Sequence, residues 1–331
     1  MAAGLGRLPP GGARRRRALR RPGLFPVAGA ASPGASRACR AGGALRAPRA
    51  VAGAGAGTPA GRAGRAGGTA VKFSIVTVCR NAADVIAGAI ESVAMQRYPD
   101  IEYLVIDGAS TDGTREIVQA HARHVDRFVS EPDGGIYAAM NKGLRLARGE
   151  VVHFLNADDR LHDPDVLADV AAFLEQTDVD VAYGDILLAL PGRSPVRVRY
   201  PPVPTRTFLG RRTLCHQALF ARRRAFAAAG GFDERFTLVA DYAWILRGIF
   251  DCRLRYAHLD RVVARVSGDG VSYRSDRLEA ERLQAMAGYY SPLEIRLLRT
   301  WPRRLAPRLD RARWYLRRLR ALLVPGPGGH P

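Results

Sequence analysis

From residue 72 onward, segments with the composition of buried β-strands alternate with segments that carry apolar residues at helical spacing. Strands are expected at 72–79, 101–107, 127–130, 150–155 and 179–185, and helices at about 84–96, 112–123, 136–147, 164–175 and 239–249. Strands that alternate with helices in this way form a mostly parallel sheet with helices on both faces. The pattern therefore predicts an α/β fold.

Polar residues follow three of these strands at the point where each strand ends. They are Arg80 and Asn81 after the first strand, Asp107 to Asp112 after the second, and Asn156, Asp158 and Asp159 after the fourth. Ligands of open parallel sheets bind beyond the carboxyl ends of the strands. We therefore expect the three clusters to converge on one crevice.

The stretch FLNADDR (154–160) places two carboxylates side by side at the end of a buried strand. A simple turn would also end a strand in this way, because Asn and Asp bond well to their own backbone. Adjacent carboxylates repel each other, however, unless a positive partner such as a hard divalent cation binds them. Mg²⁺ or Mn²⁺ usually keeps phosphate oxygens in its shell, so the expected third partner is a diphosphate.

Asp107 ends the second strand in the stretch VIDGASTDGT. Its carboxylate can accept a hydrogen bond from a base N–H or a ribose hydroxyl, while Gly108 and Gly113 allow sharp turns. Capping of the next helix by Thr111 or Asp112 is a second interpretation of the same stretch, and both can hold.

Five blocks in this order and spacing carry a family resemblance. The succession SIVTVCRN, LVIDGASTDGT, SEPDGGIYAAMNKGLRLARG, FLNADD and LVADYAWILR resembles the family 2 glycosyltransferases of the GT-A fold, especially bacterial ones that assemble exopolysaccharide or other surface glycans. The resemblance covers roughly residues 72 to 250. It implies a GT-A-like domain with a nucleotide-sugar-binding half at 71–200 and an acceptor-binding half at 201–270. Pro201, Pro202 and Pro204 indicate a linker between the two halves.

The resemblance also assigns expected roles to single residues on the donor side. Thr77, Asn81 and Asp107 fall where the family lines the nucleotide pocket, and Asp158 and Asp159 occupy its DxD-like position for metal and diphosphate. Lys142 is a further donor contact, or else a solvated helix lysine. Many relatives carry a second acid directly after Asp107. Gly108 stands there in this chain, which makes nucleoside recognition differ from that pattern.

The remaining candidates belong to the sugar and acceptor side. Gly134 and Gly135 make a tight turn where backbone can approach a sugar or phosphate. His216, followed by Gln217, matches a recurrent HQ pair, although a lone histidine is more often structural. Arg247 is expected to orient Asp241 or to contact phosphate, or to be a plain surface arginine.

Asp241 stands among apolar residues at the start of a predicted helix in LVADYAWILR. Apolar surroundings suit a carboxylate that takes a proton near neutral pH. A first-turn aspartate favoured by the helix dipole is the alternative. The resemblance to the family's catalytic acid favours Asp241 as the general base.

The resulting hypothesis is an inverting glycosyltransferase that uses Mg²⁺ or Mn²⁺, a nucleotide-diphosphate sugar donor and a glycan or lipid-linked acceptor. A non-catalytic nucleotide or glycan-binding module on the same fold is one alternative. Nucleic-acid binding through the basic ends is another, but it leaves the ordered acids unexplained and the N-terminal segment offers few aromatics to stack on bases.

The ends of the chain differ from its middle in composition. Residues 1–70 contain 13 Arg and no acidic residue, so we expect them to be disordered; a transit peptide, an export signal, a dispensable tail and an upstream translation start remain open. Removing these arginines from the formal net charge of +20 leaves +7. Residues 271–331 form a basic amphipathic end, expected either to pack as an ordinary helix or to contact an anionic membrane surface.

Two observations bear on the compartment. No window approaches 18 consecutive apolar residues, so no membrane-spanning helix is expected. The four cysteines show no metal-binding spacing. A reduced, cytoplasmic protein, peripheral at the inner face of the plasma membrane, is the simplest expectation.

Overall fold

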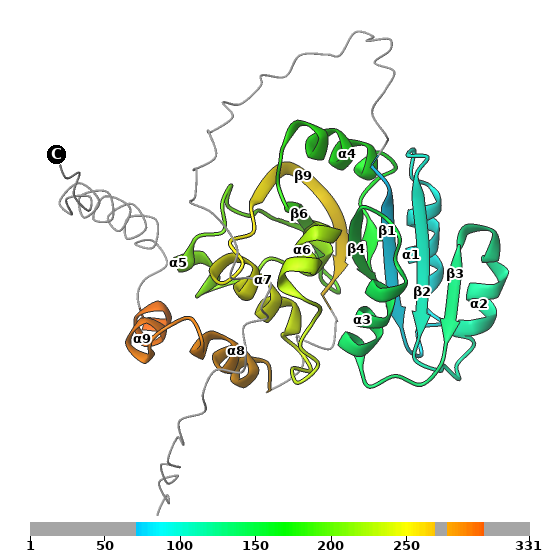
Figure 1. The fold of residues 1–331 in the computed structure, drawn as a ribbon. Helices are drawn as coiled ribbons and strands as arrows, with labels where there is room; N and C mark the ends of the chain where they lie inside the picture. The colour runs from blue at the N-terminus through cyan, green and yellow to red at the C-terminus, as the bar shows by residue number, and fades with distance from the viewer. Residues whose placement is uncertain (1–70, 269–276, 301–331) are drawn as a thin grey trace, which may run out of the picture. The chain divides into compact units, whose positions relative to one another are not determined.

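The computed structural model describes residues 71–268 and 277–300. Within them, one nine-stranded sheet has the order β3-β2-β1-β4-β8-β6-β9-β5, and β7 pairs with β6 (Figure 1). The strands are β1 Phe73–Cys79, β2 Ile101–Asp107, β3 Arg127–Ser130, β4 Val151–Asn156, β5 Arg160–Leu161, β6 Val181–Ala189, β7 Val196–Val198, β8 Leu219–Arg222 and β9 Tyr256–Ser267. The predicted α/β architecture is confirmed.

Helices connect and cover these strands. They are α1 Ile86–Ala94, α2 Thr114–Ala120, η2 Ala122–His124, α3 Ile136–Leu146, α4 Val166–Gln176, α5 Arg206–Leu209, η3 His216–Ala218, α6 Arg223–Ala229, α7 Ala240–Phe250, α8 Arg277–Ala287 and α9 Pro292–Thr300. Helix α3 packs against β1 and β2, whereas α1 packs against β1 and β5. Helices α8 and α9 lie on the side of the sheet away from β2 and β3 (Figure 1).

The local sequence explains why these elements form. All seven residues of β1 are buried, as expected for a parallel strand that is covered on both faces. Helix α1 buries Ile86, Ala89, Ile90 and Val93, which recur at the spacing of one helical face. The strands and helices thus bury the apolar residues that the sequence pattern places on their inner faces.

The strand register brings the polar strand ends together at one edge of the sheet. In the parallel pairs, Asp107 lies beside Cys79 on β1 and beside Ser130 on β3. Asn156 on β4 lies beside Val78 on the other side of β1. The expected convergence of the polar clusters therefore holds for the ends of these four strands.

The second half of the sheet departs from the simple parallel pattern. Strand β8 is antiparallel to both β4 and β6, and the long strand β9, for which the sequence analysis expected no strand, runs parallel to β6. The burial of β9 alternates irregularly along its 12 residues, so it lacks the continuous apolar run that marks the other strands. The short strand β7 lies in the stretch SPVRVRY (194–200), which has strand-like alternation of apolar and polar residues. The proposed halves, 71–200 and 201–270, contribute strands to the same sheet.

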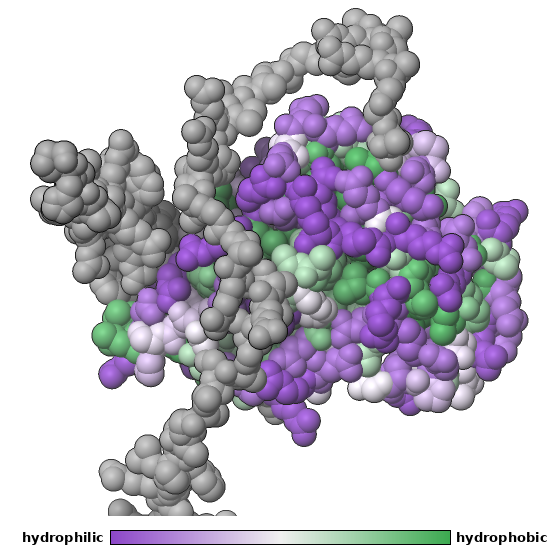
Figure 2. Space-filling view, in the orientation of Figure 1, coloured by the Kyte–Doolittle hydropathy of each residue, from purple (hydrophilic) through white to green (hydrophobic). Residues whose placement is uncertain are grey.

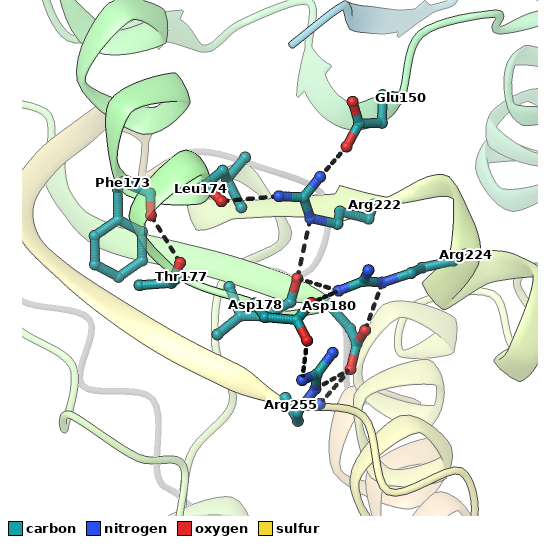
Figure 3. Close-up of polar contacts among 10 residues, drawn as sticks. Glu150, Phe173, Leu174, Thr177, Asp178, Asp180, Arg222, Arg224 and Arg255 are labelled. Atoms are coloured by element: carbon teal, nitrogen blue, oxygen red, sulfur yellow. Dashed lines mark hydrogen bonds and ion pairs between the residues drawn. The ribbon is translucent and has the colours of Figure 1, made fainter. Parts of the chain in front are cut away.

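An ionic network joins the segments from which β4, β6 and β9 begin (Figure 3). Its members are Glu150, Asp178, Asp180, Arg222, Arg224 and Arg255. Asp180 is only 9% exposed, and its carboxylate pairs with Arg224 at 2.8 Å and Arg255 at 3.3 Å. Because β4 begins here and ends at Asn156, the network lies away from the polar strand ends and ties the two parts of the sheet together.

The described part of the basic C-terminal end is helical. Arg206 of α5 pairs with Glu294 of α9 at 3.2 Å, while Leu293 and Leu297 on the same helix are 65% and 38% exposed. Hydrophobic and hydrophilic residues lie side by side in this region (Figure 2). None of the helices in the described ranges has the length and apolarity needed to cross a membrane. The expectations for 1–70 and for 301–331 lie outside the described residues.

Candidate functional site

Asp107 ties together the ends of three strands. Its side chain is fully buried and accepts hydrogen bonds from the Ser110 N–H at 3.0 Å and the Ser130 hydroxyl at 2.6 Å. The Ser110 hydroxyl also donates to it, and the Cys79 thiol lies 3.7 Å away. Burial, reinforced by the charge of Asp107, raises the pKa of the Cys79 thiol, so that thiol remains a donor. Asp107 therefore holds the ends of β1, β2 and β3 together from a buried position.

Asn81 joins the loop after β1 to the loop after β2. Its backbone has a φ of 51°, in the left-handed region that Asn tolerates better than most residues. Its N–H donates to the Ser110 hydroxyl at 2.7 Å, and its side-chain oxygen accepts from the Thr111 N–H at 3.0 Å. The structure thus brings Asn81 and Asp107 together through Ser110, as the sequence analysis expected of the two clusters.

Gly108, which stands where many relatives carry a second acid, lies next to the carboxylate of Asp133. A Cβ atom added to Gly108 would lie 2.7 Å from Oδ2 of Asp133, which comes from the segment after β3. The other oxygen of Asp133 accepts from the Gly135 N–H at 3.0 Å. The φ of 124° at Gly135 is a conformation that glycine adopts readily, and helix α3 begins at the next residue. The carboxylate of Asp133 thus occupies the space above Gly108, with Gly134 and Gly135 in the turn that follows.

Asp158 and Asp159 have different environments despite being adjacent. Asp158 is exposed, whereas Asp159 is 2% exposed and accepts from the Ser267 N–H at 2.9 Å and from the side-chain amide of Gln217. Burial, and next the charge of Asp158, raise the pKa of Asp159 to about 7. Asp158 is therefore the carboxylate that a ligand can reach, and Asp159 anchors the loop to β9.

The carboxylates present fit a divalent cation that is shared with a phosphate. Across residues 71–268 and 277–300, no group of three or more His, Cys, Asp or Glu side chains is arranged to hold a metal ion. Mg²⁺ is commonly held by one or two carboxylates, with waters and substrate phosphates completing its shell. The exposed Asp158, whose carboxylate repels that of Asp159, suits this arrangement.

Asp241, in the first turn of α7, is held by side chains from two other parts of the chain. The Tyr137 hydroxyl of α3 donates to its Oδ1 at 3.0 Å, and Nδ1 of His216 lies 3.1 Å from its Oδ2. Nε2 of the same imidazole lies 3.2 Å from Oδ1 of Asn156 at the end of β4. The structure thus connects Asp241 through His216 to the strand that precedes Asp158. No local sequence pattern marks Tyr137 as a partner of Asp241, because the two residues lie 104 positions apart.

Three further candidates lie apart from this constellation. Thr77 is fully buried, and its hydroxyl accepts from that of Tyr103 at 2.9 Å, so its side chain belongs to the core of the sheet. Lys142 forms an ion pair with Glu131 at 2.8 Å. The guanidinium of Arg247 donates to the carbonyl of Gly231; within the described residues its hydrogen bonds do not reach Asp241.

Comparison with known proteins identifies the family. Residues 74–252, more than half of the chain, match the family model described as glycosyl transferase family 2. The chain belongs to glycosyltransferase family 2. This family 2 glycosyltransferase is 34% identical over 239 residues to a PGL/p-HBAD biosynthesis glycosyltransferase of Mycobacterium bovis, a match that covers 70% of this chain and 91% of the relative.

Solved structures support the fold of this family 2 glycosyltransferase. TarS 1-349 of S. aureus, crystallised in complex with UDP, aligns with a TM-score of 0.53 at 20% identity and 69% coverage of both chains. The mannosyltransferase PcManGT from Pyrobaculum calidifontis, in complex with GDP-Man and Mn2+, aligns with a TM-score of 0.52 at 23% identity, covering 66% of this chain and 64% of its own. The predicted GT-A-like fold and glycosyltransferase class are confirmed.

Proposed function

We propose that this glycosyltransferase is metal-dependent and inverting, and that it moves a sugar from a nucleotide-diphosphate donor to a hydroxyl of a glycan or lipid-linked acceptor. Cell-surface polysaccharide or glycolipid assembly is the proposed setting. The relative named for PGL/p-HBAD biosynthesis, which this chain matches over 91% of its length, supports that setting. The structures that contain UDP, or GDP-Man with Mn2+, support the donor class and the use of a divalent cation.

One observation carries the proposal more than any other. A chain of hydrogen bonds runs from Asn156, through His216, to Asp241, with separations of 3.2 Å and 3.1 Å. Asn156 stands two residues before Asp158. One imidazole therefore joins Asp241, the carboxylate suited to an acceptor hydroxyl, to the strand end that leads into Asp158, the carboxylate suited to a donor diphosphate. This is the arrangement that a transfer between donor and acceptor needs.

On the donor side, Asp158 would hold the cation with the diphosphate. Asp159 would keep the loop in place through its bonds to Ser267 and Gln217. When bound, the cation offsets the negative charge that develops on the departing diphosphate. Asp107 and Asn81 would position the nucleoside from the ends of β2 and β1, and Asp133 would add a carboxylate above Gly108, where many relatives carry their second acid.

On the acceptor side, Asp241 would act as the general base. Its side chain is 15% exposed, so an acceptor hydroxyl can reach it. As the acceptor oxygen forms its bond to the anomeric carbon, the bond to the diphosphate breaks on the opposite face and the hydroxyl proton moves to Asp241. The configuration at the anomeric carbon inverts, and no covalent intermediate with the protein forms.

The test is donor turnover by the full chain across a panel of UDP-, GDP- and dTDP-sugars, with Mg²⁺, Mn²⁺ or EDTA. The expected result is release of one nucleoside diphosphate that requires the cation and is lost in Asp158→Ala. Asp165→Ala is the matched control, because Asp165 is a surface aspartate that pairs with Arg97 at 3.2 Å. Turnover that persists in EDTA and in Asp158→Ala would overturn the proposed metal role.

Contact with the inner face of the plasma membrane is proposed as the way to reach a lipid-linked acceptor. Helix α9 exposes Leu293 and Leu297 and carries Arg296 and Arg299 in the same segment. Basic and apolar residues together favour an anionic lipid surface. Sedimentation with vesicles that contain anionic lipid should therefore fall when Leu293 and Leu297 are both replaced by Ser. Unchanged sedimentation would remove this helix from the proposed contact.

A further inference from the structure

His216 lies between two functional segments that are distant in the sequence. Its imidazole contacts Asp241 through Nδ1 and Asn156 through Nε2, at 3.1 Å and 3.2 Å. Its side chain is 14% exposed. Residues of the short helix η3, which contains it, also pack against β4, β6 and β9, so the ring is carried by a segment fixed on several sides.

The hydrogen bonds that Asp241 already accepts determine where an acceptor hydroxyl can bind to it. An ionised carboxylate offers about four acceptor positions. Oδ1 already accepts from the Tyr137 hydroxyl at 3.0 Å and from the Tyr242 N–H at 2.8 Å. Burial, and next the charge of Asp241, raise the pKa of Tyr137, so that hydroxyl remains a donor. Among the described residues, His216 is the only hydrogen-bond partner of Oδ2. The second acceptor position of this oxygen is therefore available to an acceptor hydroxyl.

The hydrogen bond to Asp241 also determines which nitrogen of the His216 imidazole carries a proton. An ionised Asp241 cannot donate, so the nitrogen facing it, Nδ1, must carry a hydrogen. The other nitrogen faces the amide of Asn156, which can accept through its oxygen or, after a flip, donate through its nitrogen. Asn156 can therefore satisfy Nε2 whether or not that nitrogen carries a proton. The hydrogen bond on one side of the ring sets which nitrogen is protonated on the other.

The hydrogen bond between His216 and Asp241 lies beside apolar side chains. The space beside His216 and Asp241 is lined by the apolar rings of Phe154, Phe226, Phe232 and Trp244. Hydrogen bonds are stronger in such an environment than in water. Loss of the imidazole would therefore remove a hydrogen bond from a largely apolar environment.

We propose that His216 is the positioning residue of the general base: its Nδ1–H donates to Oδ2 of Asp241 and turns the remaining lone pair of that oxygen toward the acceptor. This proposal rests on the proposed role of Asp241. Asn156 holds the ring from the opposite side, at the root of the loop that carries Asp158. The contact with Asn156 thereby fixes the orientation of the ring, so that Nδ1 stays directed at Asp241.

The experiment compares His216→Ala with His216→Asn in the full chain. The side-chain nitrogen of Asn can stand near the position of Nδ1 and donate to Asp241, but it does not reach Asn156 as an imidazole does. His124→Asn is the matched control, because His124 lies in η2 and bonds to Arg123. For each variant, kcat, the KM for the donor and calorimetric binding of the nucleoside diphosphate are measured.

His216→Ala should lower kcat about 10- to 100-fold, by analogy with the loss of a residue that orients a metal ligand. Donor KM and nucleotide binding should change less than about threefold, and His216→Asn should recover most of the lost kcat. A merely structural histidine would give losses in both variants that follow thermal stability. Equal kcat in His216→Ala and wild type, or no recovery in His216→Asn with stability intact, would overturn the proposal.

A spectroscopic measurement is independent of turnover. In ¹⁵N-labelled protein, the ring signals missing from His216→Asn belong to His216, and they should report a protonated Nδ1 that shifts in Asp241→Asn. A ring protonated only on Nε2 would contradict the proposal. If Asp241→Asn retains full turnover, the base assignment fails; if it abolishes turnover while His216→Ala does not, only the role of His216 fails.

Discussion

Replacing Asn141 by Ala should destabilise the protein through a loop that supports the candidate base. Asn141, on α3, accepts from the Phe232 N–H at 2.8 Å and donates to the Phe232 carbonyl at 2.9 Å and to Glu234 at 2.7 Å. The Phe232 ring packs 5.7 Å from that of Tyr137. Tyr137 in turn donates to Asp241, so the loop lies directly behind the site.

The expected magnitude follows from the groups left without partners. Truncation orphans the buried N–H and carbonyl of Phe232, each at a cost of about 1–3 kcal/mol. Partial access of water reduces the sum, so the free energy of unfolding should fall by about 2–4 kcal/mol. Asn141→Asp should lose at least as much, because it removes the donor to the carbonyl and places a second carboxylate beside Glu234.

The assay is urea unfolding followed by fluorescence, with turnover measured on the same samples well below the transition. Arg145→Ala is the control, because Arg145 is exposed on the same helix and should change stability by less than about 0.5 kcal/mol. Turnover of Asn141→Ala should fall even where the protein is fully folded, because Tyr137 loses the packing of Phe232. A loss below about 1 kcal/mol with normal turnover would refute this reasoning.

Three other predictions concern acid stability, the nucleotide pocket and the ionic network. Burial lowers the pKa of His153 to about 4; since the unfolded chain binds the proton from about pH 6.5 downward, His153 should contribute a loss of about 2 kcal/mol of stability between pH 7 and pH 5. Asp159, whose pKa is raised to about 7, contributes in the opposite direction over the same range, so the test is the difference between variants: His153→Gln should be more stable at pH 5 relative to pH 7 than wild type in urea titrations, and an unchanged pH dependence would contradict the prediction. Gly108→Asp should weaken nucleotide binding in calorimetry, because its Cβ would displace the Asp133 carboxylate, which would otherwise lie 2.7 Å away, and would add a second negative charge beside it; binding equal to wild type would contradict the proposed role of Asp133. Asp180→Ala should lower the free energy of unfolding by about 2–3 kcal/mol, because Arg224 and Arg255 lose their least exposed partner. Turnover per folded molecule should stay unchanged. A change in the free energy of unfolding below about 0.5 kcal/mol would show that the ionic network does not hold these segments together.

The first half of the fold could be predicted from the sequence because its signals are local. The strand expected at 101–107 is observed with the same bounds, and that expected at 72–79 begins one residue later. Continuous apolar runs mark such buried parallel strands. The polar residues at their ends could be placed at one edge by topology alone, since the carboxyl ends of parallel strands lie side by side.

The remaining elements depend on contacts that a local pattern does not encode. Strand β9 lacks a continuous apolar run, and its place is set by pairing with β6. The hydrogen bond from Tyr137 to Asp241 joins residues 104 positions apart. Thr77 and Arg247 stood at plausible positions, but their partners in the core and in a neighbouring loop decide where their side chains lie. Sequence position alone could not separate the exposed Asp158 from the buried Asp159.

The most direct test of the central claim compares wild type with Asp241→Asn for nucleoside diphosphate binding and for sugar transfer under single-turnover conditions. Asn keeps the shape of the side chain but cannot take a proton from the acceptor. The account predicts that nucleotide binding stays within about threefold while transfer falls by at least about 100-fold, the lower range for loss of a general base. Transfer at the wild-type rate by Asp241→Asn would contradict it.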